Sequence, residues 1–180
     1  MKQINMDYLD KLLKGNEEYL SSLNEIGDIS SNRRKETSVN GQHPYAVIIT
    51  CSDSRVIPEA IFHVGIGDLF VIRTAGNTIG NNELASIEYA ISHLHTSLVV
   101  VLAHSGCGAI HSTIVNAKGN FVSSILNQIK IAINDEKDET KASKMNALHG
   151  VNVIKNSFKE DVNVIGMMYH IDTGKVELLK

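Results

Sequence analysis

Two continuous apolar runs, each followed at once by residues that carry chemistry, constrain this sequence more than any other feature. Residues 45–50 read YAVIIT and lead directly into CSDSR at 51–55. Residues 98–103 read LVVVLA and lead into HSGCG at 104–108. Unbroken apolar strands are typical of a parallel sheet covered on both faces. The two runs therefore predict an α/β fold in which two strand ends carry thiol, imidazole, carboxylate and guanidinium groups.

The apolar spacing elsewhere predicts strands that alternate with helices around a central, mostly parallel β-sheet. Strands are predicted at 45–50, 69–73, 98–103, 162–169 and 175–179, and helices or helical turns at 58–62, 82–95, 109–117, 121–134 and 145–158. We expect a single domain over 1–180, with a helical arm and loop at 1–40 before an α/β core at 41–180.

The segments around these elements have weaker patterns. Residues 3–26 have amphipathic helical spacing, which the pair Gly15-Asn16 is expected to interrupt. Residues 27–40 are polar and rich in turn formers, so they are expected to form a solvated loop that includes the basic triplet Arg33-Arg34-Lys35. Residues 134–144 are expected to form a charged connector.

Composition and charge exclude several classes of function. The net charge of −3, the pI of about 6.2 and the absence of tryptophan argue against nucleic-acid binding. The sequence shows no apolar stretch long enough for a membrane span and no signal-peptide core at 1–16. With only two cysteines, Cys51 and Cys107, a disulfide framework is excluded. The cytoplasm is the expected location, where both thiols stay reduced and free to bind a metal.

The two chemistry-bearing segments are expected to form one metal site. The carboxyl ends of parallel strands meet at one edge of a sheet, so Cys51, His104 and Cys107 are expected to lie together. Two sulfur ligands and one nitrogen ligand favour zinc, and three protein ligands with one open position are the pattern of a catalytic zinc. Asp53 could be a fourth ligand, or it could pair with Arg55 and accept a hydrogen bond from a zinc-bound water. The spacing leaves both roles open.

In these motifs the sequence resembles the β-class carbonic anhydrases over nearly its whole length. CSDSRV at 51–56 and HSGCG at 104–108 match the metal motifs of that family. Shorter matches are LKGN at 13–16 with Tyr19, GQHP at 41–44, GDLFVIRTAGN at 67–77, SIEYA at 86–90, and the ending 166–176 with Thr173-Gly174.

The resemblance implies zinc-dependent, reversible hydration of carbon dioxide to bicarbonate and a proton, by attack of zinc-bound hydroxide. Cys51, His104 and Cys107 would hold one Zn²⁺ per chain, and Asp53 and Arg55 would form the catalytic dyad. The substrate-binding residues would lie partly across a dimer interface, and they are Gln42, Phe70, Ala75, Tyr89 and Gly108.

The resemblance also implies a homodimer or a dimer of dimers, in which the N-terminal helical arm packs on a partner subunit. Two alternatives stay open: a hydrolase of COS or CS₂ on the same fold, and a non-catalytic, zinc-holding or redox-sensing member. The intact Asp53–Arg55 pair and Gln42 favour an enzyme, because metal storage needs neither. A nucleotide-binding protein is disfavoured, since the sequence has no GxGxxG or Walker loop.

Overall fold

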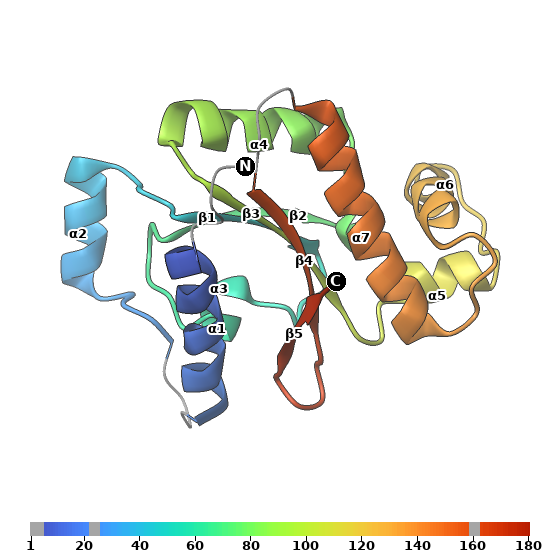
Figure 1. The fold of residues 1–180 in the computed structure, drawn as a ribbon, viewed down its shortest axis with the longest axis horizontal. Coiled ribbons are helices and arrows are strands. Elements are labelled where there is room, and N and C mark those ends of the chain that lie inside the picture. The colour runs from blue at the N-terminus through green and yellow to red at the C-terminus, as the bar shows by residue number, and fades with distance from the viewer. Residues whose placement is uncertain (1–5, 22–25, 159–162) are drawn as a thin grey trace.

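The computed structural model describes residues 6–21, 26–158 and 163–180 (Figure 1). The helices are α1 (Met6–Ser21), α2 (Ser31–Asn40), α3 (Pro58–Ile61), α4 (Asn81–Leu94), α5 (Gly108–Ile114), α6 (Val122–Ile133) and α7 (Glu139–Ser157), with a 3₁₀ turn η1 (Ala75–Asn77). The strands are β1 (Ala46–Cys51), β2 (Leu69–Thr74), β3 (Leu98–His104), β4 (Asn163–Tyr169) and β5 (Val176–Leu179). Helices cover both faces of the sheet, so the predicted α/β class is confirmed.

The five strands form one sheet in the order β2-β1-β3-β4-β5. Neighbouring strands from β2 to β4 are parallel, and β5 pairs with β4 in the antiparallel direction. Both central strands, β1 and β3, are buried along their whole length. β1 ends at Cys51 and β3 ends at His104, so the fold brings both motifs to the same edge of the sheet.

The two faces of the sheet are covered by different helices (Figure 1). On one face, α1 and α3 contribute Leu12 and Phe62 to a core under the sheet. On the other face, α4 and α7 contribute Ile87 and Val151. A third apolar cluster joins α5 and α6 to the strand end, and it contains both cysteines. The metal motifs are therefore anchored in packed side chains rather than in a free loop.

Helix α1 continues through Gly15 to Ser21, so the predicted interruption at Gly15-Asn16 is wrong. A Cβ atom on Gly15 would lie 1.9 Å from the carbonyl oxygen of Phe62. The glycine therefore allows α1 to approach the backbone at the end of α3. Its role is close packing between two helices, which the spacing of apolar residues does not reveal. The predicted helical residues 3–5 and 22–25 lie outside the described residues, as does residue 162 of the fourth predicted strand.

Asn16 fastens α1 to the body of its own chain. Its buried Nδ2 donates to the carbonyl oxygens of Ile61, at 3.1 Å, and Gly174, at 2.9 Å. Its Oδ1 accepts a hydrogen bond from the backbone N–H of Val176 at 3.0 Å. One side chain thus joins the N-terminal helix to α3 and to the start of β5. The packing of the arm on a partner subunit stays a prediction.

The prediction of a loop at 27–40 is wrong for residues 31–40, which form helix α2. Ser30 begins the helix by accepting a hydrogen bond from the backbone N–H of Arg33 at 3.1 Å. No residue of α2 is buried, so it lacks the apolar periodicity by which a helix is recognised. The Arg33 side chain is also not simply solvated, because it donates to the carbonyl oxygen of Ile66 at 2.9 Å and to Asp68 at 3.0 Å.

The predicted charged connector at 134–144 is shorter than expected. Helix α7 already begins at Glu139, where the Asp138 side chain accepts a hydrogen bond from the backbone N–H of Lys141 at 2.8 Å. Across the described part of the chain, none of the helices combines the length and apolar character needed to cross a membrane.

Candidate metal centre

The three predicted metal ligands come together at the edge of the sheet. Cys51 is the last residue of β1, His104 is the last residue of β3, and Cys107 lies directly before α5. Their ligand atoms all lie within 4.8 Å of one another, and the two sulfur atoms are 3.9 Å apart. All three residues are buried. The structure therefore forms the cluster that strand direction predicts.

His104 is oriented as a metal ligand would be. Its Nδ1 donates to the carbonyl oxygen of Ser105 at 2.9 Å, which leaves the lone pair on Nε2. That Nε2 atom is buried and has no hydrogen-bond partner. A buried polar atom without a partner is unfavourable, and a cation at this point would satisfy it. The donor set of two sulfurs and one imidazole nitrogen fits Zn²⁺.

One of the two thiols, Cys51, loses its proton readily. The second, Cys107, becomes a thiolate only when a cation lies beside the pair. The hydrogen bond from Cys107 lowers the pKa of Cys51 most, burial opposes it, and the hydrogen bond from the Gly76 N–H lowers the pKa further. The pKa of Cys107 is raised, because it donates to Cys51, is buried and would place a second negative charge beside the first. Two thiolates at this distance therefore call for a dication between them.

Asp53 is held at the rim of the cluster by Arg55. Arg55 Nε donates to Asp53 Oδ1 at 2.9 Å and Arg55 Nη2 to Oδ2 at 2.7 Å, and Nη2 also donates to the Gly106 carbonyl oxygen at 3.1 Å. These hydrogen bonds from Arg55 hold the pKa of the Asp53 carboxyl well below its usual range. Asp53 Oδ2 lies 4.0 Å from His104 Nε2. In this arrangement both carboxylate oxygens are engaged by the guanidinium, so Asp53 adjoins the metal ligands without joining them.

Two residues that the sequence analysis did not single out also shape the centre. The backbone N–H of Gly76 donates to Cys51 Sγ at 3.2 Å, and Gly76 has a left-handed φ of 68°. The side chain of Arg73 donates to the carbonyl oxygens of Asp53, at 2.7 Å, and Cys51, at 3.3 Å. Gly76 lies three residues after the predicted strand 69–73, and a glycine near a strand was a usable signal, because it often marks a close backbone approach.

Of the predicted substrate-binding residues, two adjoin the metal centre within one chain. Ala75 directly precedes Gly76, whose N–H contacts Cys51. Gly108 directly follows Cys107 and begins α5. A Cβ atom on Gly108 would meet no heavy atom within 4 Å, so there is open space beside it.

The other three predicted substrate-binding residues lie away from this centre in the same chain. Gln42 precedes β1, at the end of the strand opposite to Cys51. Phe70 lies on β2 four positions before Thr74, the register partner of Cys51, which is roughly 13 Å along a strand. The rings of Phe70 and Tyr89 are 6.3 Å apart, so Tyr89 belongs with Phe70. A single chain therefore does not bring these three side chains to Cys51.

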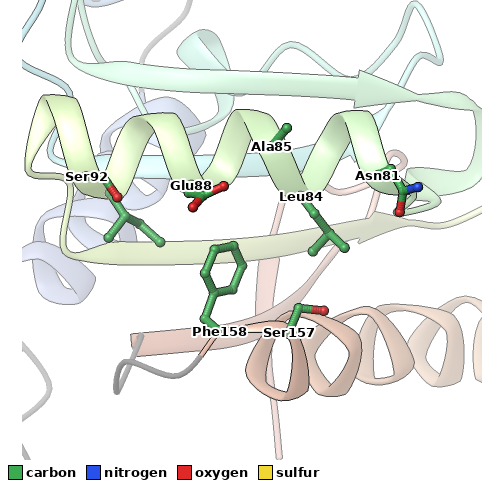
Figure 2. A pocket seen from close by; sticks show the side chains of 8 residues that line it. Asn81, Leu84, Ala85, Glu88, Ser92, Ser157 and Phe158 are labelled. Atoms are coloured by element: carbon green, nitrogen blue, oxygen red, sulfur yellow. The ribbon is translucent and has the colours of Figure 1, made fainter.

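A groove of ≈ 580 Å³ lies between α4 and the C-terminal end of α7 (Figure 2). Leu84 of α4 and Phe158, which follows α7, both point into the space between these helices, and Glu88 lies on α4 across from Phe158 (Figure 2). No residue of the metal centre lines this groove. The size of this groove therefore does not identify it as the active site.

Comparison with known proteins places the chain in a family. Residues 46–176 match the family described as "Carbonic anhydrase". The carbonic anhydrase of Mycolicibacterium smegmatis is 33% identical over 163 residues, which cover 81% of this chain and 79% of that protein. Carbonic anhydrase 2 of Mycobacterium tuberculosis is 44% identical over 103 residues, or 57% of this chain and 49% of that protein.

The solved structures agree with this comparison. A tetrameric β-carbonic anhydrase from the filamentous ascomycete Sordaria macrospora superposes with a TM-score of 0.74 at 27% identity, covering 83% of this chain and 87% of that one. The chain belongs to the β-carbonic anhydrase family. That family uses zinc, and Cys51, His104 and Cys107 are positioned as a site for it.

Proposed function

We propose that this chain catalyses the reversible hydration of carbon dioxide to bicarbonate and a proton. One observation carries the proposal: a buried cluster of two thiols and an imidazole is bordered by a carboxylate that an arginine clamps with two hydrogen bonds. A site that only stores zinc needs the three ligands but not the clamped carboxylate. The membership of the β-carbonic anhydrase family supports the same activity.

In this proposal Cys51, His104 and Cys107 hold one zinc ion per chain. A zinc ion held by these three residues would supply a nucleophile near neutral pH, by lowering the pKa of a water bound to it. The protein fixes the ligands beforehand, because the Gly76 N–H holds Cys51 Sγ and the Ser105 carbonyl oxygen holds the His104 ring. Three protein ligands leave one position open for water.

Asp53 is the proposed catalytic carboxylate and Arg55 its positioning partner. Because the pairing with Arg55 lowers the pKa of Asp53, the carboxylate stays ionised and can only accept hydrogen bonds. It would accept one from the attacking water and so aim a lone pair of that water at carbon dioxide. The Gly106 carbonyl oxygen keeps Arg55 in place, and the released proton leaves to solvent or buffer.

The substrate pocket in this proposal is shared between two subunits. Ala75 and Gly108 line it from the chain that holds the zinc, whereas Gln42, Phe70 and Tyr89 reach it from the partner. Their location away from Cys51 in one chain supports this division, as does the half-buried outer strand β2. We accordingly propose a homodimer or a dimer of dimers. The Sordaria macrospora relative is described as tetrameric.

The working unit in this proposal is the single domain 1–180, with residues 1–40 as an arm that packs on the partner subunit. Helix α2 supports this role, because it has no buried residue in a single chain. We place the protein in the cytoplasm, where reducing conditions keep Cys51 and Cys107 available to zinc.

The decisive test is stopped-flow hydration of carbon dioxide at pH 8.5 on protein with a verified zinc content. We expect fast hydration that a chelator removes and added zinc restores. COS and CS₂ are assayed in parallel. Protein with one zinc per chain that hydrolyses either gas but does not hydrate carbon dioxide would replace the proposal with the gas-hydrolase alternative. Full zinc content without any of these activities would favour a zinc-holding or redox-sensing protein.

The shared pocket is tested by mixing two inactive variants, Cys51→Ala and Gln42→Ala. If Gln42 serves the partner's site, a mixed dimer contains one site with an intact Cys51 and an intact Gln42, so activity returns after subunit exchange. If Gln42 serves its own chain, every site in the mixed dimer lacks one of the two residues. No recovery, despite verified subunit exchange, would therefore contradict the shared pocket.

A further inference from the structure

Arg73, near the end of β2, reaches across to the turn that follows β1. Its Nη2 atom donates to the carbonyl oxygen of Asp53 at 2.7 Å, and its Nε atom donates to the carbonyl oxygen of Cys51 at 3.3 Å. One guanidinium therefore contacts the backbone of a metal ligand and the backbone of the proposed catalytic carboxylate.

The turn after β1 has few other ties to the sheet. β1 ends at Cys51, opposite Thr74 of β2, and one more backbone hydrogen bond follows, from the Ser52 N–H to the Thr74 carbonyl oxygen at 3.1 Å. Beyond Thr74 the chain forms η1, so β2 no longer runs beside the turn. The donors of an arginine form a planar fork, which here spans two carbonyl groups two residues apart. The side chain of Arg73 thus takes the place of the missing strand pairing.

The position of the Asp53 carboxylate depends on how its backbone is held. Arg55 engages the carboxylate, but it belongs to the same turn, and its contact outside the turn is with the Gly106 carbonyl oxygen at 3.1 Å. Arg73 acts on the Asp53 backbone from a strand of the sheet. In this arrangement Asp53 Oδ2 lies 4.0 Å from His104 Nε2. A displacement of about 1 Å at such a group can lower a rate by about 100-fold.

We propose that Arg73 is a positioning residue for the reaction. By holding the Asp53 carbonyl oxygen, it sets the place of the Asp53 carboxylate beside the metal ligands. This inference rests on the proposed function, because it explains how the carboxylate used there is kept in place. Arg73 is exposed, so its replacement should alter the site without unfolding the chain.

The first test is a double-mutant cycle on the zinc-loaded full chain, with Arg73→Met and Asp53→Ala made singly and together. Arg73→Met keeps a long side chain without donors and should lower kcat/KM for carbon dioxide hydration at least about tenfold, while zinc content stays unchanged. In the Asp53→Ala background the same change should cost less than about threefold, because Arg73 acts through Asp53. An equal loss in both backgrounds would overturn the proposal, since a merely structural role does not depend on the carboxylate.

Two further variants serve as controls. Arg73→Lys keeps the charge but not the fork, so its activity should lie between those of Arg73→Met and the unaltered protein. Arg34→Met removes a matched contact, because Arg34 is also exposed and donates to the Ile29 carbonyl oxygen at 2.9 Å, on a helix that contributes nothing to the metal centre. It should hydrate carbon dioxide as the unaltered protein does. Sedimentation velocity compares assembly, and weaker assembly of Arg73→Met would overturn the proposal by placing its role at the subunit interface.

A second readout, by two-dimensional NMR, does not depend on activity. Asp53 accepts backbone hydrogen bonds at both ends: Oδ1 from the Arg55 N–H at 3.0 Å, and the carbonyl oxygen from the Val56 N–H at 3.0 Å. Both amide signals should shift in ¹⁵N-labelled Arg73→Met and stay in place in Arg34→Met.

The NMR result also separates this inference from the proposed function. If the unaltered protein does not hydrate carbon dioxide, the proposed function fails, but the two amide signals still decide whether Arg73 positions Asp53. A shift of the Val56 signal alone, or of neither signal, would overturn the proposal, because the carboxylate would then keep its place without Arg73.

Discussion

Strands β1 and β2 are paired in register over six residues and have similar apolar sequences, yet their surroundings differ. β1 lies inside the sheet and every residue in it is buried. β2 is the outer strand, and none of its residues is fully buried. Proteins normally protect the outer strand of a sheet with charges, bulges or a covering element. Apart from the exposed Arg73, the charged residue of this strand, β2 is mostly apolar and only partly buried, which supports the proposed contact with another chain.

The two strands also differ in what their residues do. β1 ends in a ligand whose partners, His104 and Cys107, belong to the same chain. β2 carries Phe70, which lies away from the metal cluster of its own chain. In the proposed function this sheet divides its tasks: the inner strands position the zinc ligands, and Phe70 on the outer strand contributes to the pocket of a neighbouring subunit, while Arg73 at its end supports the metal centre of its own chain. Four predictions test this division.

The largest effect is expected at the ends of the two strands. Cys51→Ser removes a zinc ligand, so zinc content should fall from one per chain toward zero and carbon dioxide hydration by at least about 10³-fold. Its register partner provides the control, since Thr74→Ser keeps the hydroxyl that donates to the Thr78 carbonyl oxygen at 2.8 Å. Zinc analysis and stopped-flow kinetics check both variants. A Cys51→Ser protein that keeps its zinc would remove Cys51 from the ligand set.

The next effect concerns stability in the middle of each strand. Ile49 is fully buried, so Ile49→Ala should lower the free energy of unfolding by about 2–5 kcal/mol. Its register partner Ile72 is only partly buried, so Ile72→Ala should cost less than about 1.5 kcal/mol in the single chain. Urea unfolding at a protein concentration below that of assembly measures both. Equal losses would show that β2 is as much a part of the core as β1.

A charge on each strand separates folding from assembly. Val71→Lys places a charge on the outer strand and should weaken subunit association at least about 100-fold, or about 2.7 kcal/mol, while the chain stays folded. Ile48→Lys, at the register partner on β1, should prevent folding, because it buries an unpaired charge. Sedimentation velocity and circular dichroism distinguish the two outcomes. A folded Val71→Lys protein that assembles normally would place the interface elsewhere.

The smallest effect is expected where α2 supports the segment before β2. Arg33→Ala removes the contacts with Asp68 and with the Ile66 carbonyl oxygen and should cost about 1 kcal/mol, because these groups are partly exposed. Amide hydrogen exchange should rise in α2 and around 65–68 and stay unchanged in β1. Arg33→Lys keeps the charge contact with Asp68, so its stability and its amide exchange should lie between those of the unaltered protein and those of Arg33→Ala. Faster exchange throughout β1 would show that the strands are not independent.

The core of the fold and the metal ligands follow from the sequence, because they depend on two strong signals. The unbroken apolar runs at β1 and β3 predict inner strands of a parallel sheet, and the residues that follow them have to meet at one edge. The position of Gln42 in the fold could be predicted from the same signals. It precedes β1, so strand direction alone places it at the end opposite to Cys51.

The elements that were predicted wrongly are held by polar contacts rather than by apolar periodicity. Helix α2 has no buried face. Only Ser30, whose side chain accepts a hydrogen bond from the backbone N–H of Arg33, indicates where the helix starts. Asp138 gives a similar signal before α7, but the surrounding charges resemble those of a solvated segment. Gly15 reads as a helix breaker because the carbonyl of Phe62, which it approaches, is distant in sequence.

The hydrogen bonds of Asn16 have a consequence for how the protein is made. The side chain of Asn16 bonds the backbone N–H of a residue 160 positions later, Val176. At 5–20 residues per second, a ribosome needs roughly 8–32 s to add the intervening chain. The three zinc ligands have all been synthesised by residue 107, long before β5 exists. Translation thus supplies every metal ligand, and the α6 residues that pack against them, before the final strand that fastens the first helix.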